Sequence, residues 1–194
     1  MKKWFALLLA VVMVLCCLTA CGGKEETEPT EPPEEKIEWM PYGLTFGMTY
    51  DEAKAANSEM PEISLQENGS YFSKRQGVEA EFIKGYYGVP ANEDESLFWL
   101  MRAPAFFYSY NQDKELYEFY AMITAFDADD AEVVHSHLKS YYTDLIKTEA
   151  TVTEYSDATV AKWEKDGVTV ELAKEEDSIS VIMHDSNNDL DANK

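Results

Sequence analysis

The last third of the chain alternates between apolar and polar residues. Three runs show this period of two, and short polar turns separate them: Val160–Lys165, Val168–Ala173 and Ile179–His184. Successive side chains of a strand point to opposite faces, so the alternation predicts strands with one buried face. Asp166-Gly167, between the first two runs, is typical of a tight hairpin turn. We therefore expect antiparallel hairpins in this region.

A helical period precedes these strands. Four apolar residues follow the spacing i, i+4, i+7 and i+11 that places them on one face of a helix: Val134, Leu138, Tyr141 and Leu145. The segment Asp129-Asp130-Ala131-Glu132 predicts the start of this helix, with an Asp as its cap. A shorter helix is predicted from Thr49 to Asn57, because Thr49 and Glu52 can form a capping box.

Two segments, 90 residues apart, resemble each other. Lys74–Phe82 and Glu164–Leu172 each contain a polar turn with Gly that leads into an alternating strand. A strand-like run that ends in Phe also precedes each helix, at Tyr42–Phe46 and at Tyr117–Phe126. We expect two tandem repeats, 37–110 and 115–185, each a strand, a helix and a strand meander.

The predicted fold class is therefore α+β, with a mainly antiparallel sheet and helices packed on it. Asn68-Gly69 adds a further tight hairpin between Ile63–Gln66 and Tyr71–Ser73.

Aromatic residues are concentrated between Phe98 and Tyr120. One alternating set indicates the strand face under the helices: Tyr117, Phe119, Ala121, Ile123 and Ala125. The other set is more apolar than a solvated face requires: Leu116, Tyr120, Met122 and Phe126. Either the sheet is covered on both sides, or an aromatic patch is exposed for a protein partner or a glycan.

The hairpin around Asn111-Gln112-Asp113-Lys114 carries aromatic residues on both faces. Surplus aromatic side chains near a hairpin tip can remain exposed and contact a partner. We predict four contact residues here, with burial in the core as the alternative: Phe107, Tyr108, Tyr110 and Tyr117.

The amino terminus has the pattern of a secretory signal. Lys2 and Lys3 precede 17 uncharged residues, Trp4–Ala20, fewer than the about 20 that a membrane-spanning helix needs. The signal ends in Leu18-Thr19-Ala20-Cys21, which resembles the lipobox of bacterial lipoproteins. This resemblance implies that residues 1–20 are removed, that the Cys21 thiol carries lipid, and that the domain is held on the exterior face of the cell membrane.

Composition divides the mature chain into three parts. Residues 22–36 have no large apolar side chain, which predicts a disordered acidic, Pro-rich linker after the anchor at Cys21. Residues 37–185 are rich in aromatic and aliphatic residues and have the size of a single domain. Residues 186–194 are polar again and are expected to form a disordered tail.

Charge limits the partners. The chain has 37 acidic residues against 16 Lys and Arg, a net charge of −21, and two of the Lys would leave with the signal. Such a surface excludes nucleic acid, because phosphate binding needs clustered Lys and Arg. The strong acidity serves solubility, or alternatively binds a basic partner or divalent cations.

Catalytic and metal-binding motifs are absent from the sequence. His135 and His137 are two residues apart on the predicted helix and so point to different sides, and His184 ends the last strand; we expect all three to be ordinary surface or half-buried residues. Asp185, Asn187 and Asp189 match the first positions of a calcium loop, but Leu190 stands where that loop needs Gly. We expect neither a metal nor a cofactor.

A second resemblance concerns the domain. Phe46-Gly47-Met48-Thr49-Tyr50-Asp51-Glu52-Ala53 is similar to the helix start of small two-repeat envelope lipoproteins of the outer-membrane-assembly and β-lactamase-inhibitory-protein types. This resemblance implies a non-enzymatic module that binds another envelope protein or a cell-surface ligand. The alternatives are a surface hydrolase that uses paired carboxylates and a cation-binding envelope protein.

Overall fold

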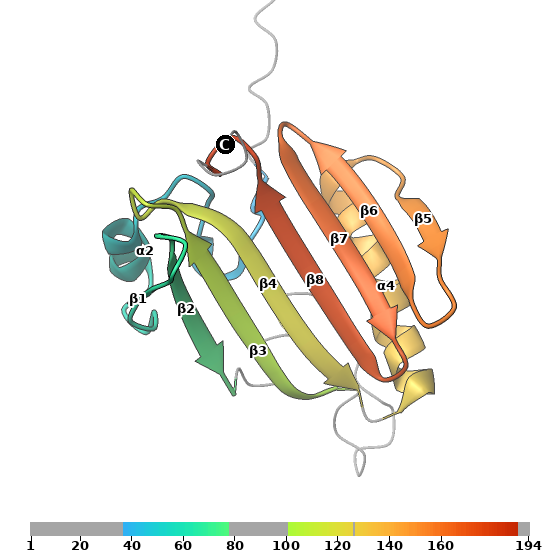
Figure 1. Ribbon diagram of the computed structural model, residues 1–194. Helices are drawn as coiled ribbons and strands as arrows, with labels where there is room; N and C mark the ends of the chain where they lie inside the picture. Colours follow the sequence, from blue (N-terminus) through green and yellow to red (C-terminus); the bar gives the residue numbers. More distant parts are fainter. Residues whose placement is uncertain (1–36, 78–100, 126, 190–194) are drawn as a thin grey trace, which may run out of the picture. The chain divides into compact units, whose positions relative to one another are not determined.

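The computed structural model describes residues 37–77, 101–125 and 127–189. All of them belong to the second of the chain's two compact units, Ile37–Lys194. In chain order the elements are η1 (Pro41–Gly43), α2 (Tyr50–Ala56), β1 (Ser64–Leu65), β2 (Tyr71–Gln76), β3 (Met101–Tyr110), β4 (Leu116–Ala125), α4 (Ala128–Ile146), β5 (Thr151–Glu154), β6 (Thr159–Lys165), β7 (Val168–Glu175) and β8 (Ser178–Asp185). The strands form one antiparallel sheet in the order β1-β2-β3-β4-β8-β7-β6-β5 (Figure 1). The predicted α+β class is confirmed.

The strand order divides this domain into two similar halves. Among the described elements, each half has a helix followed by four strands, α2–β4 and α4–β8, and the antiparallel pair β4–β8 joins the halves at the centre of the sheet. This division assigns β4 to the first half, whereas the sequence pattern predicts it at the start of the second repeat. The predicted equivalence of Lys74–Phe82 with Glu164–Leu172 stays a prediction, because residues 78–82 lie outside the described residues.

The predicted strand Tyr42–Phe46 is wrong. Its first residues belong to the short 3-10 helix η1, and Tyr42 and Gly43 have φ values of 65° and 70°. Pro41 lacks a backbone N–H and starts this turn, so the apolar residues that follow are buried by a turn and not by a strand. Leu44 is 1% exposed.

Capping residues set the helix starts. The Thr49 hydroxyl accepts from the Glu52 amide and the Glu52 carboxylate accepts from the Thr49 amide, so the predicted capping box is confirmed. The same bonds to Thr49 hold the pKa of Glu52 below its usual value. In α4, however, Asp127 accepts from the Asp130 amide at 2.9 Å, so the helix begins two residues earlier than predicted.

Both helices cover the same face of the sheet, which we call the inner face. Figure 1 shows α4 running behind β6 and β7, and α2 lying beside β1 and β2. The Tyr142 ring of α4 lies 5.8 Å from Trp163 of β6, and the Tyr50 ring of α2 lies edge-on to Tyr110 of β3 at the same distance. The buried face of α4 is Ala131, Val134, His135, Leu138, Tyr142 and Ile146, slightly rotated from the predicted stripe.

Residues 186–189 belong to the domain, so the prediction of a disordered tail from 186 is wrong for them. Asp185 is buried and its carboxylate accepts from the Asn187 amide and from the side chains of Asn187 and Asn188. Asn111, in the β3–β4 turn, donates to the Asn188 carbonyl at 2.9 Å. These bonds fix the segment after β8 against a neighbouring turn.

Candidate functional site

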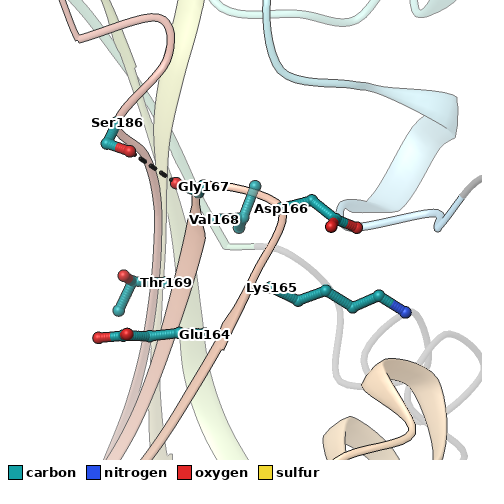
Figure 2. Close-up of a pocket in the computed structure, with 7 residues that line it drawn as sticks. All are labelled: Glu164, Lys165, Asp166, Gly167, Val168, Thr169 and Ser186. Atoms are coloured by element: carbon teal, nitrogen blue, oxygen red, sulfur yellow. Dashed lines mark hydrogen bonds between the residues drawn. The ribbon is translucent and has the colours of Figure 1, made fainter.

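One hollow lies at the β6–β7 turn (Figure 2). It has a volume of about 350 Å³ and is lined by Glu164, Lys165, Asp166, Gly167, Val168, Thr169 and Ser186. In Figure 2, Glu164 and Thr169 point to one side of the ribbon, whereas Lys165 and Asp166 point to the other. Ser186 donates to the Gly167 carbonyl, and Lys165 donates to the Ile146 carbonyl. Catalysis needs groups that converge on one reacting atom, and these side chains do not.

The more informative surface is the outer face of the sheet, opposite α2 and α4. None of the described helices covers it (Figure 1). Side chains alternate along each strand, so the outer residues of β3 are those between the fully buried Phe106, Tyr108 and Tyr110. Phe107 is therefore an outer residue.

Register brings side chains from four strands into a line across this face. Lys74 of β2 pairs with Phe107 of β3, Phe107 with Tyr120 of β4, and Tyr120 with Ile182 of β8. We call these four residues the outer ladder. Cross-strand neighbours on one face are close enough to contact each other, so the ladder is a continuous row.

The rings of the ladder stand against each other. Phe107 and Tyr120 are stacked, with centroids 5.0 Å apart and planes at 22°, and the Lys74 ammonium lies 4.9 Å from the Phe107 centroid. Phe72, one row away, lies 6.0 Å from Phe107. All three rings are half-buried, so each is partly covered by its neighbours and keeps some exposed surface.

Beyond Ile182 the same row becomes charged. Glu171 of β7 and Lys162 of β6 continue the register, and Lys162 pairs with Glu171 at 3.2 Å and with Glu164 at 3.3 Å. These carboxylates raise the pKa of Lys162.

The Tyr120 hydroxyl of the ladder stays protonated and able to donate a hydrogen bond. Burial, and to a smaller extent the nearby Glu175, raises its pKa.

Of the four predicted contact residues, two are wrong. Tyr108 and Tyr110 have no exposed surface, and burial raises the pKa of Tyr110. Phe107 and Tyr117 are half-buried, and the Tyr117 ring lies edge-on to His184 at 5.7 Å. Phe107 is in the outer ladder, whereas Tyr117 lies near the carboxyl end of β8. Cys21 lies outside the described residues, and its lipidation stays a prediction.

A register shift explains one further correction. The pairing of β3 with β4 changes between Ser109 and Tyr110, so that Leu116 comes opposite Tyr110 and is fully buried. Leu116 and Tyr117 therefore exchange the faces that strict alternation predicted. Among the ladder residues, Lys74 and Ile182 were missed, because only the pairing of strands shows that they join Phe107 and Tyr120.

The histidines form no metal site. Within the described ranges, no group of three or more His, Cys, Asp or Glu could hold a metal ion. His184 lies 3.6 Å from Glu118 and 3.3 Å from Asp189. His135 is 5% exposed, more buried than predicted, and burial lowers its pKa.

Neither helix of the described part is both long and apolar enough to cross a membrane. No family model, curated protein or solved structure matches the chain.

Proposed function

We propose that the chain is a bacterial lipoprotein whose domain binds another envelope protein through the outer face of its sheet. The observation that carries the proposal is the outer ladder, an apolar and aromatic row on a face that no described helix covers. Charged residues lie beside it on the same face, among them Glu118 and Glu171. An aromatic centre with a polar rim is the usual anatomy of a protein interface.

Ring geometry favours a protein over a glycan. A sugar ring stacks on a free aromatic face, but Phe107 has Lys74 on one side and Tyr120 on the other. The surface that remains accessible is part of each half-buried ring and the side chains of Met122 and Ile182; Met122 is 36% exposed. Such a surface fits apolar side chains of a protein partner, which can pack between the outer ladder and its neighbours on the outer face.

The net charge of the chain indicates which charge the rim of the partner's binding surface should carry. The chain carries a net charge of −21, and Glu118 and Glu171 lie on the outer face beside the ladder. Two acidic surfaces repel each other, so a second copy is disfavoured and a partner with a basic rim is favoured. The expected anchor at Cys21 would keep the domain at the membrane, where envelope partners are concentrated.

Site-specific photo-cross-linking in intact cells tests the proposal. A photoreactive residue replaces Met122 beside the ladder in one variant and, as the matched control, Val152 on β5 in another; both side chains are exposed, at 36% and 41%. We expect a discrete protein adduct from position 122 that is absent from position 152. Equal adducts from both positions, or none from position 122, would contradict the proposal.

A further inference from the structure

The β1–β2 turn holds an asparagine in a chemically distinctive arrangement. The Asn68 side-chain oxygen accepts from the Ser70 hydroxyl at 2.6 Å and from the Ser70 amide at 3.0 Å. Ser70 is 5% exposed, so its two donors are fixed, whereas Asn68 itself is exposed. The residue between them is Gly69, with φ at +84°.

We propose that Asn68 is a site of spontaneous deamidation that Ser70 accelerates. Gly69 has no side chain to shield its backbone nitrogen, which is the atom that attacks an asparagine side chain in this reaction. The attack moves negative charge onto the Asn68 side-chain oxygen. Two fixed donors at that oxygen stabilise this charge in the way that an oxyanion hole does.

The reaction is balanced by water alone. Hydroxide removes the proton of the Gly69 amide, and the nitrogen bonds to Cγ of Asn68 while the C=O electron pair moves to Oδ1. This pair returns, the Cγ–Nδ2 bond breaks, and Nδ2 leaves as ammonia with a proton from water. Water then opens the cyclic imide at either carbonyl and gives aspartate or isoaspartate at position 68.

Local opening of the β1–β2 hairpin can free the Gly69 nitrogen for the attack. The Gly69 amide donates to the Gln66 carbonyl at 3.1 Å, and this bond must open before the proton is lost. Among the described strands, β1 (Ser64–Leu65) lies at the edge of the sheet and pairs only with β2. Short edge elements open locally at low free-energy cost, so the step is accessible in the folded protein.

The chain contains two matched comparisons. Asn57 precedes Ser58 and its side-chain oxygen accepts one backbone amide, that of Glu59. The Asn111 side-chain oxygen also accepts two hydrogen bonds, from the amides of Asp113 and Glu115, but Asn111 is 3% exposed and Gln112 follows it. Conversion should therefore be concentrated at Asn68.

Peptide mapping by mass spectrometry, after incubation of the folded domain at mildly alkaline pH, tests the proposal. Trypsin releases Ala55–Lys74, so Asn57 and Asn68 are read in the same peptide. We expect conversion at Asn68, as a mixture of aspartate and isoaspartate, while Asn57 stays intact. Ser70→Ala should slow it about fivefold, the rate equivalent of one ordinary hydrogen bond.

Incubation in denaturant provides the control. There the wild-type chain and Ser70→Ala should convert at the same rate, because the bonds from Ser70 are absent. The proposal fails if folded Ser70→Ala converts as fast as the wild type or faster, since Ser70 would then only hold the side chain away from Gly69. It also fails if Asn57 converts before Asn68.

Discussion

Two adjacent residues of β3 provide the sharpest test of which sheet face is buried. Tyr108 has no exposed surface and its ring lies 5.5 Å from Phe119 in the core, whereas Phe107 is half-buried in the outer ladder. Truncating a fully buried aromatic side chain to Ala costs about 3–5 kcal/mol, which is the expectation for Tyr108→Ala. Phe107→Ala removes a half-buried ring and its stacking, so we expect a loss of about 1–2 kcal/mol.

Denaturant unfolding of residues 37–194 measures both losses. The midpoint should fall much further for Tyr108→Ala than for Phe107→Ala, with unchanged slopes. Binding should be affected in the opposite order. Phe107→Ala should abolish the cross-link from position 122, whereas Tyr108→Ala should keep it. Equal stability losses would refute the reasoning, because Phe107 would then be a core residue beneath a cover that some other part of the chain supplies.

Three further predictions concern stability, pH and the anchor. Gly167→Ala should destabilise the domain by about 1–3 kcal/mol, because φ is +84° and the new Cβ would collide with the Asn187 side chain; the unfolding midpoint measures it. Burial lowers the pKa of His135, so the unfolded chain binds a proton first, and stability should fall as pH drops below about 6.5. His135→Gln should flatten this decrease in melting temperature whereas His137→Gln, the control, should keep it. Cys21→Ala should abolish metabolic acyl labelling; a wild-type chain without label would contradict the lipoprotein proposal.

The late strands could be predicted because their two faces differ in polarity. β6, β7 and β8 each alternate apolar and polar residues, and turns such as Asp166-Gly167 separate them, so period and turn chemistry indicate the same hairpins. The start of α4 was harder to place, because Asp127, Asp129 and Asp130 are all good caps. The observed choice of Asp127 depends on its bond to the Asp130 amide.

The inner face of β3 could not be predicted, because apolar residues occupy both faces. In Ala105-Phe106-Phe107-Tyr108-Ser109-Tyr110 either alternating set is apolar enough for a core. Only the packing of α2 and α4 decides that Phe106, Tyr108 and Tyr110 are inside. The register shift beside Tyr110 then exchanges Leu116 and Tyr117, and no local sequence signal marks it.

The outer ladder has a structural role besides the proposed binding role. Each stacked or cation–π contact between neighbouring strands contributes about 0.5–1 kcal/mol to the sheet, which is reason enough for Phe107 and Tyr120 to be aromatic. Sheet stability does not explain Met122, which follows Tyr120 by two residues on the outer face and is 36% exposed. An exposed thioether beside a half-buried aromatic row contributes little to the fold, but it adapts readily to a partner's side chains. The contacts within the ladder therefore stabilise the sheet, whereas the exposed apolar side chain of Met122 beside it is accounted for by the proposed binding.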